Sequence, residues 1–291
     1  MKKKERVEAV FIILHYKNIN DTIECINSIR TLEDKNYKII VVDNNSGVEE
    51  DDRKLKTLVD DLIILEENIG FAKGNNKGIE LAREKYQPDF MIVINNDTLL
   101  TQKDLLKRIQ NIYKEHPFDA LGFKILTNEG DSVNPFPVYD TLDKVNKAID
   151  KSEMLLGIYN SKFKRFLLRT YSKIKRLIKK PSHLENADCF LEDVALHGCA
   201  IIFSKRYYDK YKDCFYSRTF LYHEEEFLNY RRRKDNLKFI YDPNIEIFHK
   251  EGSSLNYDYN DDLYRKLIFR ESNILKSLKL LKEVMIKNKK I

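Results

Sequence analysis

The chain has 291 residues, 42% of them hydrophobic and 34% charged, a balance that excludes a disordered protein and favours a soluble globular one. No apolar run approaches the roughly 18 residues of a membrane-spanning helix, and the four cysteines show neither paired nor metal-type spacing. We therefore expect a cytoplasmic protein with reduced thiols.

The first 125 residues alternate between strand-like and helix-like segments. We expect strands at 7–14, 37–42, 62–65, 90–94 and 120–125, with helices at 21–32, 75–86 and around 105–112. The first of these strands follows a lysine-rich start and imitates a signal peptide, but Glu8 and the missing cleavage site argue against one. Strands that alternate with helices predict an α/β fold with a mostly parallel sheet covered on both faces. The loops after residues 14, 42, 65 and 94 should then share one edge of the sheet, where α/β proteins bind ligands.

The second half is less regular. From about residue 128 to 188 the pattern lapses, and Pro135 and Pro137 indicate a loop there. Beyond it we expect a strand at 194–204, an acidic helix at 223–233, short strands at 238–241 and 246–249, and a lysine-rich helix from about 261.

The strand at 90–94 leads directly into Asn95, Asn96 and Asp97. A carboxylate flanked by amides at a strand end suits a divalent cation that carries a phosphorylated ligand. The alternative is that Asp97 caps a helix starting near Gln102. The segment alone does not separate the two interpretations.

Two earlier strand ends also carry polar groups. Asp43 could accept a hydrogen bond from a ribose hydroxyl or a base N–H, although the Asn-Asn-Ser-Gly after it is typical of a turn. Residues 67–78 form a glycine-punctuated loop that opens a helix, and its amides with Lys73 could contact a diphosphate. The loop is neither a Walker motif nor a GxGxxG fingerprint, which disfavours ATP and dinucleotides. An ordinary strand-to-helix turn with a capping asparagine is the alternative.

Candidate proton-transfer and metal-binding groups lie near the end of the chain. Glu224, Glu225 and Glu226 stand at a predicted helix start, which the helix dipole favours for acids. One of them could instead take a proton from an attacking hydroxyl, and their mutual repulsion would raise the pKa of one carboxyl. His249 ends a strand and could bind a metal through a neutral imidazole, although a lone histidine there is more often structural.

In their order along the chain these parts resemble the inverting nucleotide-sugar glycosyltransferases of the GT-A fold, in particular glycosyltransferase family two. The parts that carry the resemblance are Asp43, 68–78, 95–97, His197-Gly198, Glu224-Glu225 and His249. The resemblance covers about 7–252. It implies a Rossmann-like, mostly parallel central sheet with helices on both faces, plus a helical insertion and a C-terminal helix.

The resemblance also implies a reaction and a division of the chain. A sugar, hexosyl or deoxyhexosyl, would pass with inversion from a nucleoside-diphosphate sugar to a hydroxyl of a glycan or lipid-linked acceptor, in bacterial capsule or cell-surface polysaccharide synthesis. Residues 1–127 would bind the donor, 128–190 would be a variable insertion, 191–257 would form the acceptor and catalytic half, and 258–291 a basic C-terminal helix.

Site residues follow from the same resemblance. Glu225 would be the catalytic base, with Glu224 beside it, and Asp97 and His249 would hold Mg²⁺ or Mn²⁺. Donor-binding residues would be Tyr16, Asp43, Asn68, Gly70, Lys73, Asn76, Asn95, Asn96 and Asp97. Two positions depart from the family pattern: Asn95 replaces the first aspartate of the Asp-x-Asp segment, which would weaken metal binding, and Glu225 replaces an aspartate. The register among the three glutamates stays open.

The segment 162–180 carries nine Lys or Arg, so that the remaining residues of this +6 chain sum to −3. Apolar residues at helical spacing between these charges predict a basic amphipathic helix, suited to an anionic surface such as the inner face of the plasma membrane. A helix packed on the protein's own core or at a subunit interface of a homo-oligomer fits the pattern equally well.

Three other functions fit parts of the sequence. The basic segment also suits a non-catalytic protein that binds nucleic acid or a membrane, but nucleic acid is not expected, because that function leaves Asp43, Asp97 and 224–226 unexplained. A sugar-phosphate nucleotidyltransferase would need a glycine-rich start after the first strand, which is missing. A catalytically inactive scaffold stays open because of Asn95.

Overall fold

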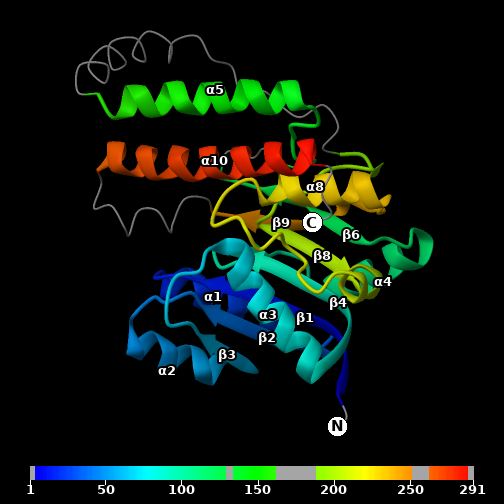
Figure 1. Ribbon diagram of the computed structural model, residues 1–291. Helices are drawn as coiled ribbons and strands as arrows, with labels where there is room; N and C mark the ends of the chain where they lie inside the picture. Colours follow the sequence, from blue (N-terminus) through cyan, green and yellow to red (C-terminus); the bar gives the residue numbers. More distant parts are fainter. Residues whose placement is uncertain (1–3, 129–133, 162–187, 251–261, 288–291) are drawn as a thin grey trace.

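The computed structural model describes residues 4–128, 134–161, 188–250 and 262–287. One open, twisted sheet runs through the molecule with helices on both faces, and two long helices, α5 and α10, lie side by side beyond one end of it (Figure 1). The predicted basic helix at 162–180 lies outside the described residues.

Nine strands of the described residues form the sheet in the order β3-β2-β1-β4-β8-β6-β9-β5, with β7 added on β9. Strands β1 to β4 pair in parallel, β8 runs antiparallel to β4 and β6, and β9 is parallel to β6. The predicted α/β architecture is confirmed. The strands are β1 (Glu5–His15), β2 (Tyr37–Asp43), β3 (Asp61–Ile64), β4 (Tyr86–Asn95), β5 (Thr98–Leu100), β6 (Ala120–Leu126), β7 (Leu191–Glu192), β8 (Ala200–Ser204) and β9 (Phe239–His249).

Helices cover both faces of the sheet because the central strands are apolar on both sides. Along β1, Phe11 and Ile13 face one apolar layer with α1 and α4, while Val10 and Ile12 face the other with α3 and α7. The helices are α1 (Ile19–Arg30), α2 (Glu49–Leu58), α3 (Phe71–Lys85), α4 (Leu105–Glu115), α5 (Leu142–Tyr159), α7 (Lys205–Lys210), α8 (Glu224–Asp235) and α10 (Leu263–Ile286).

A third apolar cluster joins α5, α8 and α10. It contains Val145 and Ile149 of α5, Phe227 of α8, and Leu278 and Leu281 of α10. Two long helices with one apolar stripe each bury those stripes against one another, which explains the pairing.

The lapse of pattern expected between 128 and 188 is wrong for 142–159, where α5 is a regular helix. Its N-cap is Thr141, whose side chain accepts a hydrogen bond from the N–H of Lys144. A buried serine interrupts its apolar stripe. The hydroxyl of this residue, Ser152, donates a hydrogen bond to Glu271 of α10. Helix α2 and the short elements β5, β7 and α7 were not predicted either.

The predicted strand at 194–204 is correct only for its second half, because β8 begins at Ala200. Before that point the backbone N–H groups of His197 and Gly198 donate to the side chains of Asn134 and Glu225 and not to a neighbouring strand. The two short strands predicted at 238–241 and 246–249 are the two halves of β9, which pair with β6 on either side of a register shift.

The ends of the strands meet at one edge of the sheet, as predicted. His15 pairs with Asp43, Asp43 with Ile64, and Leu14 with Asn95. Because β8 is antiparallel to β4, its beginning reaches the same edge. None of the helices in the described part of the chain combines the length and hydropathy that crossing a bilayer requires.

Candidate active site

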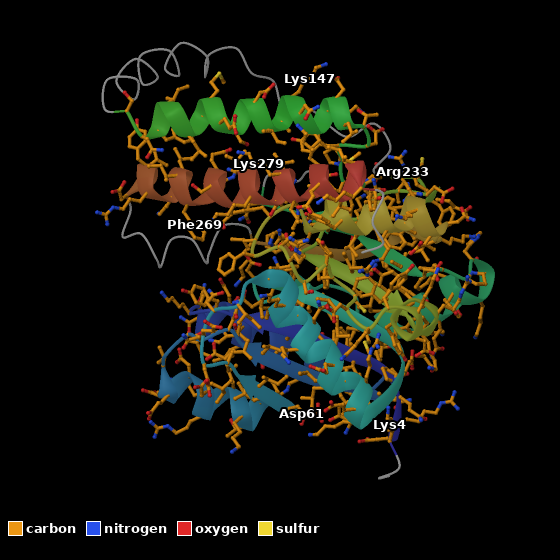
Figure 2. All side chains as sticks on the ribbon, viewed as in Figure 1. Lys4, Asp61, Lys147, Arg233, Phe269 and Lys279 are labelled. Carbon is orange, nitrogen blue, oxygen red and sulfur yellow. The ribbon has the colours of Figure 1, made fainter. Side chains whose placement is uncertain are left out.

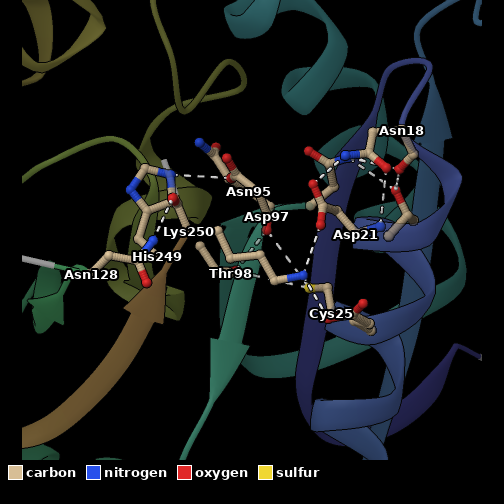
Figure 3. A network of polar contacts seen from close by, with 12 residues as sticks. Asn18, Asp21, Cys25, Asn95, Asp97, Thr98, Asn128, His249 and Lys250 are labelled. Carbon is tan, nitrogen blue, oxygen red and sulfur yellow. Dashed lines mark hydrogen bonds and ion pairs between the residues drawn. The ribbon is translucent and has the colours of Figure 1, made fainter. Parts of the chain in front are cut away.

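Asp97 and His249 form a buried polar pair at this edge. Asp97 follows β4 and is buried, and its Oδ1 lies 3.1 Å from Nε2 of His249 at the end of β9 (Figure 3). The carbonyl oxygen of Asp97 also accepts from the N–H of Lys250 at 3.0 Å. The helix-cap alternative for Asp97 is therefore wrong: α4 begins at Leu105, after Asp104.

Lys250 and Asn96 extend this network to α1. Lys250 Nζ lies 2.7 Å from Asp21 and 2.6 Å from Glu24, so its charge is neutralised by the helix (Figure 3). The Asn96 amide donates to Thr22 Oγ1 at 3.0 Å. Asn96 thus fixes the position of the segment on α1, while the side chain of Asn95 lies half-buried at the edge.

His15 lies inside the same network, at the end of β1. Its Nδ1 is 2.8 Å from Thr22 Oγ1, and that hydroxyl donates to the Asn18 carbonyl oxygen at 3.0 Å. Thr22 must therefore accept from an Nδ1–H of His15. Burial lowers the pKa of His15 to about 4, so the ring is neutral near pH 7. This residue was not among the sequence candidates.

Asp43 is buried at the end of β2 and closes the turn that follows it. Its Oδ1 accepts from the backbone N–H of Ser46 at 2.9 Å and from the Ser46 hydroxyl. The same hydroxyl accepts from the N–H of Lys17 at 2.8 Å, and this bond holds the segment of Tyr16 beside Asp43. Burial and the proximity of Asp43 raise the pKa of Asp52. The geometry thus shows the turn role of Asp43, and a role in donor binding remains a prediction.

The glycine loop is attached to the turn before α8. Gly70 has φ +85°, and a Cβ there would lie 2.2 Å from the carbonyl oxygen of Phe220. That oxygen accepts from the N–H of Phe71 at 2.7 Å. Asn68 accepts from the N–H of Gly70 at 3.0 Å, so it shapes the turn. It does not cap α3, as the alternative interpretation expected, because the N-cap is Gly70 and no side chain caps the helix.

Lys73 and Asn76 lie in the first two turns of α3. Both line a cavity of about 540 Å³ between α3 and the segment 212–217. The side-chain amide of Asn76 makes two hydrogen bonds to the backbone of Phe215, at 2.8 and 3.0 Å. Asn76 therefore holds this segment in place.

The three glutamates at the start of α8 occupy different environments. Glu225 is half-buried, and its Oε1 accepts from the N–H of Gly198 at 3.0 Å. Glu226 is buried and accepts from the N–H of Tyr139 with both carboxyl oxygens, each at 3.0 Å. Glu224 is buried as well, and burial is the largest cause that raises the pKa of both Glu224 and Glu226 to about 8. The repulsion expected from the sequence is a smaller cause.

Gly198 connects Glu225 to the strand edge. The next residue, Cys199, accepts from the N–H of Asn95 at 2.8 Å through its carbonyl oxygen. The rings of His197 and His249 lie 6.2 Å apart. Glu225 therefore lies at the same edge as Asn95 and His249, a convergence that no short sequence motif encodes, since Gly198 and Glu225 are 27 positions apart.

A comparison with protein families matches residues 10–211 to the model of glycosyl transferase family 2. The chain belongs to this family. The matched segment contains Asp43 and Asp97, while Glu225 and His249 lie beyond it. A comparison with curated protein sequences finds no match.

Solved structures similar to this family 2 chain share its GT-A fold. TarS of S. aureus, residues 1–349, is 15% identical with a TM-score of 0.53, over 91% of this chain and 65% of that one. The same fragment in complex with UDP is 14% identical, with a TM-score of 0.52 over 91% and 65% of the two chains. GalNAc-T7 with UDP, GalNAc and Mn²⁺ is 11% identical, with a TM-score of 0.54 over 85% and 44%. The family 2 chain thus spans about two thirds or less of these chains, and likeness at such identity shows the fold alone.

The pair Asp97 and His249 has the geometry of two ligands on one divalent cation. Two ligands at right angles, each about 2.1 Å from a cation, lie about 3 Å apart. The observed separation of Oδ1 and Nε2 is 3.1 Å, and Nδ1 of His249 is buried with no partner in the described part of this family 2 chain. Within the same residues, no three His, Cys, Asp or Glu gather into a metal site. Substrate phosphates and water would complete the coordination, as is usual for Mg²⁺.

Proposed function

We propose that the protein is an inverting glycosyltransferase that moves a sugar from a nucleoside-diphosphate donor to a hydroxyl of a glycan or lipid-linked acceptor. One observation carries the proposal: Glu225, the half-buried acid of the three, is held by Gly198 at the edge where Asp97 pairs with His249. A general base and a cation site on one edge are what inverting transfer from a diphosphate requires.

Glu225 is the candidate base. Its carboxylate accepts one backbone hydrogen bond and keeps a lone pair for the acceptor O–H, whose proton it takes as the hydroxyl attacks the anomeric carbon. Glu224 and Glu226 are poorer candidates because burial keeps their carboxyls protonated near pH 7.

Asp97 and His249 would hold the cation, which when bound supplies positive charge for the departing diphosphate. A nitrogen ligand favours Mn²⁺ over Mg²⁺, because imidazole binds transition metals better. Tyr16, Asp43 and the loop from Asn68 to Gly70 border the same edge, and we assign them to the nucleotide. Lys73 and Asn76 would contact the parts of the donor that reach α3.

The proposal includes a hexosyl or deoxyhexosyl donor and a role in bacterial capsule or cell-surface polysaccharide synthesis. An anionic membrane contacted through 162–180 would bring a lipid-linked acceptor to the enzyme. A pool of nucleotide sugars with Mg²⁺ or Mn²⁺ tests the activity through release of nucleoside diphosphate. NMR of the product tests inversion: retained anomeric configuration would contradict the role given to Glu225, since an inverting reaction needs one base and one displacement.

A further inference from the structure

A second groove lies beside the candidate site, between α10 and the turn that precedes α8. Its volume is about 610 Å³. Six α10 residues at spacings of three and four form its wall, together with Phe220 of the turn, and they are Arg265, Ile268, Phe269, Ser272, Asn273 and Lys276. The face of α10 that carries Leu278 and Leu281 packs on α5 instead.

Two side chains of α10 show that its groove face and its α5 face are different sides of the helix. Phe269 points away from α5, while Lys279 lies between the two helices (Figure 2). Lys279 pairs with Glu153 of α5 at 2.7 Å. The helix thus presents one face to its neighbouring helix and a different face to the groove.

The lining of the groove is aromatic and cationic. Phe220 and Phe269 supply apolar surface, and Ser272 and Asn273 supply polar groups. Among the described residues, no acidic side chain belongs to the lining. Arg265 is partly neutralised by Asp262, at 3.3 Å. Lys276 is exposed and forms no ion pair with any described residue. The lining is therefore complementary to a ligand with negative charge and flat apolar surface.

The groove adjoins the parts of the candidate site that must meet an acceptor. The carbonyl oxygen of Phe220 is bonded to Phe71 at the glycine loop, and Glu225 follows five residues after Phe220. Helix α10 is fixed to the same turn, because the hydroxyl of Ser277 donates to the Leu221 carbonyl oxygen at 3.4 Å. A ligand in the groove would therefore lie against the turn that leads into Glu225.

We propose that this groove is the acceptor subsite and that the acceptor is a glycosyl phosphate. Its sugar rings lie against Phe220 and Phe269, and its phosphate binds Lys276, with Arg265 at the other end of the wall. The inference rests on the proposed function, whose acceptor it names by class. Aromatic rings pack on the apolar faces of sugars, and a lysine without an ion pair is free to bind phosphate.

Calorimetric titration of the full chain tests the subsite without turnover. The probes are a disaccharide 1-phosphate, the same free disaccharide, and phosphatidylglycerol vesicles. We expect Lys276→Ala to weaken binding of the disaccharide 1-phosphate about tenfold and to leave the free disaccharide unchanged, since one charged hydrogen bond is lost. Phe269→Ala should weaken both sugars, and the matched control Lys279→Ala should behave as wild type.

Three results would overturn the subsite. They are equal weakening by Lys276→Ala and Lys279→Ala, equal affinity of wild type for the two sugars, or Lys276-dependent binding of vesicles alone. Donor hydrolysis should be the same in Lys276→Ala and wild type. A wild type that releases no nucleoside diphosphate from any nucleotide sugar with an acceptor present, yet binds the disaccharide 1-phosphate through Lys276, would reject the proposed function and leave the groove as a glycosyl phosphate site.

Discussion

The Glu225 carboxylate accepts a hydrogen bond from the backbone N–H of Gly198 at 3.0 Å, and this contact fixes the start of α8 against the edge of the sheet. Gly198 has no side chain, and a Cβ at this position would lie 2.9 Å from Glu225 Oε1. The close approach of helix and loop therefore depends on a glycine.

Gly198→Ala should reduce transfer about 100-fold, because the added methyl displaces the carboxylate of Glu225 by a fraction of an ångström or more. The folded state should lose little stability, since only one flexible side chain has to move. Steady-state kinetics and a thermal melt check both expectations. Gly157→Ala is the control, because nothing lies within 4 Å of a Cβ there. Equal activity of the two variants would show that transfer does not depend on the position of the Glu225 carboxylate.

Gly70→Ala should destabilise the protein more than Gly47→Ala does. Both residues have positive φ, +85° and +73°, so both substitutions strain the backbone by about 1 kcal/mol. Only at Gly70 would the methyl also strike a backbone atom, the carbonyl oxygen of Phe220 at 2.2 Å. Urea unfolding of both variants measures the difference. If the two lose the same stability, the contact between the glycine loop and Phe220 is not tight in solution.

Asn95→Asp should raise the affinity for Mn²⁺ by about tenfold, since a second carboxylate joins Asp97 at the cation site. Asp97→Asn should lower the affinity instead, and EDTA should remove transfer activity from the wild type. Electron paramagnetic resonance of free Mn²⁺, recorded with UDP present, follows binding directly. Unchanged Mn²⁺ binding in both variants would place the cation elsewhere.

Glu224→Gln should stabilise the protein at pH 8.5 and leave it unchanged at about pH 4. Burial raises the pKa of Glu224 from 4.5 to about 8, so the folded state binds a proton that the unfolded state has lost. The stability contributed by this protonated carboxyl is complete below about pH 4.5 and is lost as the pH rises through 8. The side chain of glutamine does not ionise in this pH range, so the variant lacks this loss of stability. Thermal melts across this range test the sign, and a pH-independent difference between the proteins would contradict it.

Much of the N-terminal half could be predicted from the sequence, because its determinants are local. Apolar strands that end in Asp43 or Asn95, followed by amphipathic helices, specify parallel pairing and hence a shared edge. Asp97 and His249 could each be identified as a candidate from the strand that precedes it. Their 3.1 Å contact joins residues 152 positions apart, which no periodicity in the sequence encodes.

The errors also have physical causes. The apolar segment from Val194 onward has the composition of a strand, but Asn134 and Glu225 take the N–H groups of His197 and Gly198, and the ladder begins only at Ala200. Helix α5 was missed because a buried serine interrupts its stripe, although Thr141 with Val145, Ala148 and Ile149 could have indicated it. The choice of a candidate base among the three glutamates depends on how deeply each side chain is buried. Burial is set by tertiary packing, so the sequence alone could not decide it.

The most direct test of the account compares wild type with Glu225→Gln in transfer from the active nucleotide sugar to an acceptor, with Mn²⁺ present. Glutamine preserves the size of the side chain and can still accept from Gly198, but it cannot take the acceptor proton. We predict that kcat falls by at least about 100-fold, while donor binding and the melting temperature stay the same. Transfer by Glu225→Gln at the rate of the wild type would contradict the assignment of Glu225 as the base.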